Sequence, residues 1–351
     1  MVNLLIVDDS RTIREYFEYI LGQDPDINIV GKACNGKEAL SFVKKLKPDI
    51  IAMDIDMPVM DGLEATRQIM SSTPIPIIIV TARRNAKNKE VSMEALASGA
   101  LTVVEKPAGI KSANNAEYIQ LTKLIKTYSK VKVLTRRNLK RPAQPSKLQV
   151  VEPKQTIPDK EILKQIELIS IGVSTGGPEV LKTILSSIPA NFPVPIVAVQ
   201  HITPGFLDSM VSWLNSISPL HIKVAENGEF IKPGVVYFAP DKQHMTVVSN
   251  KIKLIKNMVN NPICPSVDAL FRSLLDNASK TLALLLTGMG SDGALAMKEL
   301  YDRDALTVAQ DKASSLIHGM PGEAIKINAV KHVLDLAGIS KLLNNINELM
   351  K

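Results

Sequence analysis

Five short apolar runs alternate with amphipathic segments in the first third of the chain. The runs are NLLIVDD, INIVGKA, DIIAMDI, PIIIVTA and LTVVEKP, and the segments between them, such as RTIREYFEYILG, repeat apolar residues every three or four positions. Regular alternation of strand and helix predicts a doubly wound, five-stranded parallel sheet with both faces covered. Ligands of such sheets bind beyond the carboxyl ends of the strands, so the polar residues at those ends are the candidate functional residues.

Acidic, hydroxyl and amino side chains follow four of these runs. Asp8 and Asp9 end the first, Asp54 the third, Thr81 the fourth and Lys106 the fifth. Three carboxylates at one sheet edge repel one another unless a hard cation neutralises them, and oxygen ligands of this kind suit Mg²⁺. A carboxylate beside bound Mg²⁺ can attack a phosphoryl group, while a lysine and a hydroxyl compensate the charge on its oxygens. A single aspartate here could equally cap a helix, but capping does not account for the whole set.

The motifs IVDDS, MDIDMPVMDG, VTA and VEKP resemble, in order and spacing, the receiver domain of bacterial response regulators, a flavodoxin-like fold. The resemblance implies that Asp54 accepts a phosphoryl group. It also implies that Asp9, Asp54 and the backbone carbonyl of Asp56 bind Mg²⁺, with Asp8 supporting the site. The expected product is a phosphoprotein whose phosphorylation requires Mg²⁺.

The same resemblance assigns phosphoryl sensing to Thr81 and Lys106, and it implies a cis peptide between Lys106 and Pro107. Receivers often carry an aromatic residue three positions before the lysine, where this chain has Val103. We therefore expect signalling through Thr81 and backbone shifts alone.

The second half of the chain repeats the alternation over a longer stretch. ELISIGV, PIVAVQH, GVVYFAP, HMTVVSN, TLALLLTG and ALTVAQD are candidate strands, and residues 228–261 have the short spacing of antiparallel strands. This pattern predicts a second, larger doubly wound α/β domain, mostly parallel, with an antiparallel hairpin at its edge.

A basic segment with several prolines separates the two alternating regions. Residues 122–164 hold twelve Lys/Arg and three Asp/Glu, a net charge of +9, which leaves −2 of the chain's +7 for everything else. The predicted organisation is a receiver over 1–121, an extended linker over 122–165 and a second domain over 166–351. The linker charge either stays solvated or contacts an acidic partner. Since the output half is not basic, an output domain that binds DNA through a basic recognition helix is disfavoured.

The stretch IGVSTGGPEV follows the first run of the second half. A phosphate-binding loop needs a lysine or a G-x-G-x-x-G spacing that it lacks, whereas Gly172, Ser174 and Gly176 satisfy G-x-S-x-G, a turn that raises a serine above a sheet. A serine nucleophile needs a base and an orienting acid, and His201 and Asp292 both fall just beyond predicted strands. Taken singly, the three could be a helix cap, a core histidine and a turn residue. Their chain order also differs from that of α/β-hydrolases.

The motifs SIGVSTGGPEVL, VAVQHITPGFLDSMVSWLN, APDKQHM, PSVDALFRSL, LLLTGMGSDGA and GMPGEA follow one another as in the catalytic domain of the CheB family of chemotaxis protein-glutamate methylesterases, which this half resembles. The resemblance implies a triad of Ser174, His201 and Asp292 that needs no cofactor. It places Thr175 near the nucleophile and the Met289 amide region as an oxyanion donor. The implied reactions are hydrolysis of glutamate methyl esters on chemoreceptors and deamidation of receptor glutamines.

Partners follow from the same resemblance. Methylated chemoreceptors are the expected substrates and the chemotaxis histidine kinase the expected phosphoryl donor, with no nucleic acid and with membrane contact only through receptors. The domain order suggests that an unphosphorylated receiver covers the active-site mouth and that phosphorylation loosens it. The alternative is a catalytically silent, phosphorylation-dependent binding module. The family more often has aromatic and basic residues where this chain has His318 and Gly322, which leaves receptor preference open.

The start of the chain has no basic, apolar leader, and no apolar stretch approaches the roughly 20 residues of a membrane span. We therefore expect a cytoplasmic protein. Cys34 and Cys264 fall in different predicted domains, so neither a disulfide nor a cysteine metal site is expected.

Overall fold

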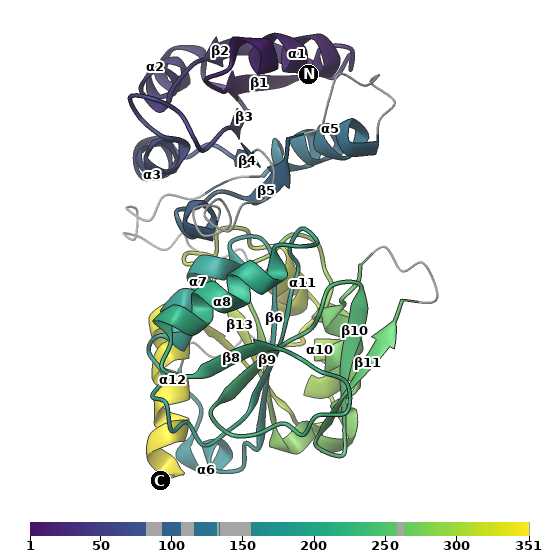
Figure 1. Cartoon of the computed structure of the whole chain (residues 1–351). Helices are drawn as coiled ribbons and strands as arrows, with labels where there is room; N and C mark the ends of the chain where they lie inside the picture. Colours follow the sequence, from purple (N-terminus) through teal and green to yellow (C-terminus); the bar gives the residue numbers. More distant parts are fainter. Residues whose placement is uncertain (82–92, 107–115, 132, 134–155, 258–262, 351) are drawn as a thin grey trace. The chain divides into compact units, whose positions relative to one another are not determined.

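The computed structural model describes residues 1–81, 93–106, 116–131, 133, 156–257 and 263–350 (Figure 1). The chain divides into two compact units, residues 1–138 and 139–351, and each is described by itself. Among the helices in these ranges, none combines the length and the apolarity that crossing a bilayer requires.

The first unit contains a five-stranded parallel sheet in the order β2-β1-β3-β4-β5, and all five predicted strands are confirmed. In this unit, α2 packs against α3 and α1 against α5; Figure 1 labels the four helices. The strands are β1 (Val2–Val7), β2 (Ile27–Ala33), β3 (Ile50–Met53), β4 (Ile77–Thr81) and β5 (Thr102–Glu105). The described helices are α1 (Arg11–Leu21), α2 (Gly36–Leu46), α3 (Gly62–Ser72) and α5 (Ala116–Tyr128).

The local sequence explains where these elements lie. Strands β3 and β4 are buried at every residue, as continuous apolar runs covered on both faces must be. Each of the first three helices begins at a polar residue whose side chain accepts an amide of the first turn. These N-caps are Ser10, Asn35 and Asp61.

The second unit contains seven parallel strands in the order β14-β13-β12-β6-β7-β9-β8. Strand β6 lies in the middle, between β12 and β7, and all three are buried throughout. The strands are β6 (Leu168–Val173), β7 (Ile196–Gln200), β8 (His221–Val224), β9 (Val235–Phe238), β12 (Thr281–Leu285), β13 (Leu306–Gln310) and β14 (His332–Leu334). The helices are α6 (Lys160–Leu163), α7 (Gly177–Leu185), α8 (Leu207–Ile217), α9 (Val267–Arg272), the 3₁₀ helix η1 (Leu275–Lys280), α10 (Ala294–Tyr301), α11 (Met320–Lys326) and α12 (Leu336–Leu349).

The predicted antiparallel hairpin is present, but it does not extend the edge of the large sheet. Strands β10 (Gln243–Val248) and β11 (Lys251–Lys256) pair antiparallel as a two-stranded sheet of their own, and β9 belongs to the parallel sheet. Two strands, β8 and β14, were not predicted, and β11 was expected only as a hairpin strand somewhere within residues 228–261. Two of these are only three or four residues long, and β11 alternates with exposed lysines, so none shows the continuous apolar run of a central strand.

Helices extend into the predicted linker from both of its ends. Residue 121, the expected end of the receiver, lies inside α5, which continues to Tyr128. Helix α6 begins at Lys160, within the expected linker of 122–165. Most of that linker lies outside the described residues.

Gly62, the first residue of α3, gives a prediction for the first unit. A Cβ at Gly62 would lie 1.9 Å from the backbone oxygen of Asp54, which is closer than any real contact. Because backbone cannot yield as a flexible side chain can, we expect Gly62→Ala to lower the free energy of unfolding of this unit by roughly 2 kcal/mol or more. Native-state hydrogen exchange of amides in β1 and β3 measures this quantity. Ser72→Ala, at an exposed position in the last turn of the same helix, should change it by less than about 0.5 kcal/mol. Equal effects of the two substitutions would contradict the close approach.

Candidate functional site

The polar residues predicted from the first sheet gather at its carboxyl edge. Asp8, Asp9 and Asp54 each offer a carboxylate oxygen, and these oxygens all lie within 4.8 Å of one another. Asp8 and Asp54 are buried while Asp9 is exposed, so the cluster opens to solvent on one side. Hard oxygen ligands with access to water are what Mg²⁺ prefers, and this donor set therefore fits the cation. Asp56 is exposed directly after β3, where the prediction needs only its backbone carbonyl.

Lys106 brings a positive charge directly to the carboxylates of this cluster. Its Nζ lies 2.7 Å from Oδ2 of Asp8 and 2.7 Å from Oδ2 of Asp54. Burial raises the pKa of Asp54 to about 6, although the Lys106 ammonium acts to lower it. Burial alone would lower the pKa of Lys106, but its hydrogen bonds with both carboxylates raise it above the ordinary value. The lysine thus stays charged and holds both carboxylates.

Thr81 ends β4 with a buried hydroxyl that has no hydrogen-bond partner in the described part of the chain. A buried, unpartnered donor is costly and calls for an explanation. A phosphoryl oxygen on Asp54 would supply the missing acceptor, which fits the predicted sensing role. Val103 is buried within β5, and the predicted cis peptide at Pro107 lies outside the described residues.

The second site lies at the carboxyl ends of β6, β7 and β12. The amide of His201 donates to the carbonyl of Val173 at 2.9 Å, so the backbones of Ser174 and His201 continue side by side beyond β6 and β7. The amide of Ser174 donates to the carbonyl of Thr287 at 2.9 Å, which brings in the loop after β12. Ser174 is buried, with 8% of its surface exposed.

The loop after β12 must pass directly over Ser174. An ideal Cβ on Gly288 would lie 2.6 Å from the Cβ of Ser174 and 2.4 Å from the sulfur of Met320. No side chain fits there, which explains a glycine at this position. Beyond Gly288 the same loop carries Asp292, whose Oδ2 lies 2.9 Å from Nε2 of His201, the residue that follows β7.

Asp292 is a buried carboxylate with several donors. Besides His201, it accepts hydrogen bonds from Ser266 Oγ at 2.8 Å, from the Val267 amide at 2.7 Å and from the Asp268 amide at 3.2 Å. Burial alone would raise the pKa of Asp292, but the hydrogen bond and charge of His201, with the other donors, hold it below its ordinary value. The carboxylate is therefore ionised and able to stabilise a protonated imidazole.

The structure thus joins two members of the predicted triad and places the third beside them. Among the described hydrogen bonds, none connects Ser174 Oγ to His201. Hydrogen bonds of catalytic groups often tighten only when a substrate binds, so this geometry leaves the triad as a prediction. Thr175 is buried, its carbonyl accepts the Thr287 hydroxyl at 2.9 Å, and Met289 is half-buried next to Gly288.

Three residues that organise the second site were not singled out from the sequence. Nε2 of Gln200 donates to the carbonyls of Ser174 at 2.9 Å and His201 at 2.8 Å, and so ties the two strand ends together. The Thr287 hydroxyl binds the carbonyl of Thr175, and the Ser266 hydroxyl binds the carboxylate of Asp292. A buried glutamine inside the apolar run PIVAVQH was the available signal, because buried polar side chains need partners.

Arg14 has a similar role in the first site. Its Nη1 donates to the backbone carbonyls of Asp8 at 2.6 Å and of Asp9 at 2.9 Å, which fixes the acidic loop after β1. Arg14 lies in the first turns of α1, and nothing in the sequence around it predicted that its side chain would contact the loop after β1.

The two departures from the family pattern contact each other. A Cβ on Gly322 would lie 3.1 Å from Cδ2 of His318, so the missing side chain at residue 322 leaves room for the imidazole. The backbone of His318 also pairs with that of Gly288, the residue that passes over Ser174, as an isolated parallel β-bridge. The pair therefore lies close to the candidate nucleophile.

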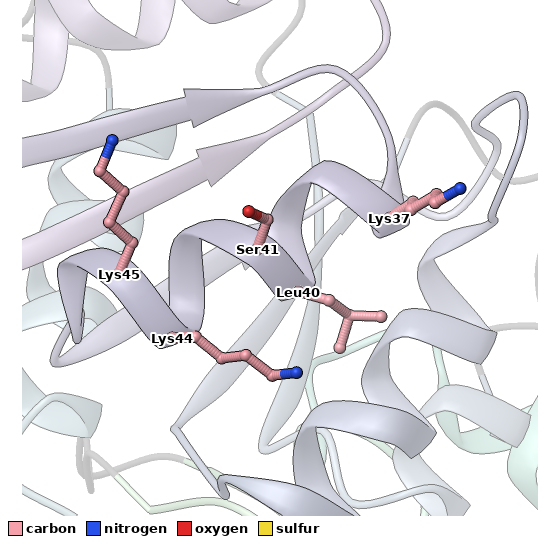
Figure 2. Close-up of a pocket in the computed structure, with 5 residues that line it drawn as sticks. All are labelled: Lys37, Leu40, Ser41, Lys44 and Lys45. Carbon is pink, nitrogen blue, oxygen red and sulfur yellow. The ribbon is translucent and has the colours of Figure 1, made fainter.

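A separate shallow pocket lies on α2 in the first unit (Figure 2). Its lining comes from this one helix and consists of Lys37, Leu40, Ser41, Lys44 and Lys45. The three lysines are exposed, and none of the strand-end residues described above contributes. We assign the pocket no function.

A cluster of aspartates bridged by a lysine in one unit, and a buried serine beside a half-buried histidine and its buried aspartate in the other, fit a response regulator receiver joined to a hydrolase domain. The family model for the response regulator receiver domain matches residues 4–116, and that for CheB methylesterase matches residues 169–343. The chain belongs to the CheB methylesterase family.

Relatives of similar length support this assignment. A protein of Syntrophus aciditrophicus named protein-glutamate methylesterase/protein-glutamine glutaminase 1 is 43% identical over 346 residues, 98% of this chain and 97% of the relative. A Hahella chejuensis protein of the same name, numbered 3, is 41% identical over 348 residues, 98% of each chain. Among solved structures, the CheB methylesterase catalytic domain of Thermotoga maritima is 38% identical, covers 51% of this chain and 98% of that chain, and has a TM-score of 0.48. The similarity to the two relatives runs through nearly the whole chain.

His318 gives a prediction for the pH dependence of stability. Burial lowers its pKa below the ordinary value of 6.5, against the charge of Asp311, which acts to raise it. The unfolded chain therefore binds more protons than the native one as the pH falls below 6.5, and stability is lost over that window. His318→Phe removes the group, so the variant should gain stability relative to wild type between about pH 7.5 and about pH 5.5. Urea unfolding followed by fluorescence of Trp213, the chain's one tryptophan, reports on this unit. A stability difference that is the same at both pH values would contradict the prediction.

Proposed function

We propose that the chain hydrolyses methyl esters of glutamate side chains on chemoreceptors and that phosphorylation at Asp54 controls the reaction. The observation that carries the proposal is the imidazole of His201, bound to the buried Asp292 and placed beside Ser174 at the strand ends. The relatives' names supply the ester and amide substrates. A buried carboxylate on the imidazole is what a general base needs to take a proton from a serine.

The first half of the reaction forms an ester between the enzyme and the substrate. His201 takes the hydroxyl proton of Ser174 as Oγ attacks the ester carbonyl. Asp292 stabilises the imidazolium that forms. The carbonyl C–O bond to the methoxy group then breaks, and the imidazolium gives its proton to the methoxy oxygen, which leaves as methanol.

The second half reverses the roles. Water loses a proton to His201 and attacks the acyl carbon, Ser174 leaves with that proton, and a glutamate side chain is released. Negative charge builds on the carbonyl oxygen in both halves, and the backbone amide near Met289 is the proposed donor to it, with Thr175 beside the nucleophile. Deamidation of a glutamine follows the same steps with ammonia in place of methanol, and we propose it as a second activity.

The receiver half supplies control. Asp54 would accept the phosphoryl group, and Asp8, Asp9, Asp54 and the carbonyl of Asp56 would hold Mg²⁺, which neutralises charge on the phosphoryl oxygens when bound. Lys106, already beside Asp54, and the unpartnered hydroxyl of Thr81 would contact the new oxygens. These contacts are not possible before phosphorylation, so they can stabilise a different arrangement of the receiver.

The same proposal assigns the partners. Methylated chemoreceptors are the substrates, and the chemotaxis histidine kinase is the phosphoryl donor. The chain would act in the cytoplasm and reach the membrane only through these receptors.

The experiment that tests the catalytic half is methanol release from methylated chemoreceptor membranes by the purified full chain. We expect Ser174→Ala and His201→Ala to lower kcat on the order of a millionfold, because the triad acts as a unit. The residual rate should come from binding and oxyanion contacts alone. A rate within tenfold of wild type for either variant would rule out the assignment, and a wild-type chain without release would favour a binding module.

The control by phosphorylation has its own test in the same assay. Acetyl phosphate with Mg²⁺ should stimulate methanol release by the wild-type chain, and a stimulation of about 100-fold corresponds to roughly 2.7 kcal/mol of coupling. Asp54→Asn should abolish the stimulation. Asp49→Asn makes the same change at an exposed residue before the other end of β3 and should preserve it. Stimulation that survives in Asp54→Asn would contradict the role of this residue.

A further inference from the structure

Two aspartates in the second unit exchange hydrogen bonds with each other's helix. Asp292 precedes α10, yet its carboxylate accepts the amides of Val267 and Asp268, the first two residues of α9. Asp268 lies in the first turn of α9, and its Oδ1 accepts the amides of Gly293 at 3.1 Å and Ala296 at 3.0 Å at the start of α10. Each carboxylate thus satisfies amides that its partner's helix leaves without intrahelical acceptors.

The exchange matters most for α10. The N-cap of this helix is Gly293, in a left-handed conformation at a φ of 88°, and a glycine has no side chain to accept an amide. Asp268 therefore takes over the capping role from outside the helix. Helix α9 differs, because its own N-cap Ser266 accepts the Ala269 amide and also donates to Asp292.

Gly293 follows Asp292 directly, so a bond that fixes the Gly293 amide also fixes the backbone from which Asp292 projects. We infer that Asp268 is a positioning residue that holds the Asp292 carboxylate against His201. The inference rests on the proposed function, since it assigns Asp268 to the hydrolytic machinery. No atom of Asp268 needs to touch the substrate.

The charged groups around Asp268 compensate its closeness to Asp292. Asp268 and Asp292 are both acidic, and burial together with the charge of Asp292 raises the pKa of Asp268. Arg272 lies 3.8 Å from the second oxygen of Asp268, and its other guanidinium nitrogens reach Glu299 at 2.9 Å. Two like charges near each other are tolerated here because backbone amides and one arginine compensate them.

The test compares Asp268→Ala with Asp268→Asn in the full chain. Alanine removes the acceptor for the Gly293 and Ala296 amides, and a displaced carboxylate at this distance from the reaction should lower kcat by roughly 100-fold with little change in KM. Asparagine keeps an acceptor oxygen of the same shape and should retain kcat within about threefold of wild type. Rescue by asparagine separates positioning from charge.

A matched control accounts for the general effect of losing a helix cap. Asp335 is the N-cap of α12, accepts the Gly338 amide at 2.7 Å, and follows the edge strand β14 rather than a strand beside β6. Asp335→Ala should lower the unfolding midpoint by a similar amount and leave kcat unchanged. Loss of kcat in Asp268→Ala beyond this control supports positioning.

A second measurement does not depend on the substrate. In the full chain labelled with ¹⁵N-histidine, the ring proton between His201 and Asp292 should be protected from solvent exchange, with the signal assigned through His201→Gln. Asp268→Ala should speed this exchange at least tenfold, while Asp268→Asn and Asp335→Ala should not. If the wild-type chain releases no methanol, this measurement still decides the role of Asp268 while the proposed function fails alone. Unchanged exchange in Asp268→Ala, or equal loss of kcat in the alanine and asparagine variants, would overturn the inference.

Discussion

The path of the loop after β12 across the end of β6 is the constraint on which the second unit's site depends. β6 lies between β7 and β12, so an acid that follows β12 can meet a histidine at the end of β7 only by passing over the serine between them. Gly288 makes the passage possible because any side chain there would collide with Ser174. The amide of Ser174 and the hydroxyl of Thr287 fasten the crossing. The other contacts of the site then hold the ends of β6, β7 and β12 at a constant spacing.

Both units place their polar residues at the carboxyl edge of a parallel sheet, but they solve different electrostatic problems there. The first site concentrates like charges, and Lys106 bridges the carboxylates of Asp8 and Asp54, of which burial raises the pKa of Asp54. In the second site one carboxylate accepts hydrogen bonds from two backbone amides at the start of α9, from the Ser266 hydroxyl and from His201. A bridged cluster can change when a charge is added to it, whereas a carboxylate held by backbone is rigid. That contrast suits a regulated unit and a catalytic unit respectively.

Much of this architecture was predictable from the sequence because parallel strands are continuous apolar runs and their ends are marked by polar residues. All five strands of the first unit and the approach of His201 to Asp292 were anticipated in this way. Partners of buried polar groups were not, because they depend on which strands are neighbours. Gln200 and Asp268 act on segments 26 and 25 residues away in sequence, and no local pattern encodes such pairs. The hairpin itself was predicted, but its separation from the large sheet was not, since alternation shows that two strands pair but not which other strands they join.

The hydroxyl of Thr287 links three segments, because it accepts the Ile317 amide and its one proton lies within hydrogen-bond reach of the carbonyls of Thr175 and Ile317. Gly288 adds backbone bonds to Ile317, Gly319 and Met320. The backbone of residues 317–320 is therefore held by the same loop that holds Ser174. An insertion or deletion in this segment would displace the groups that bind Thr287 and Gly288, whereas a change of side chain at residue 318 or 322 would leave those backbone bonds in place.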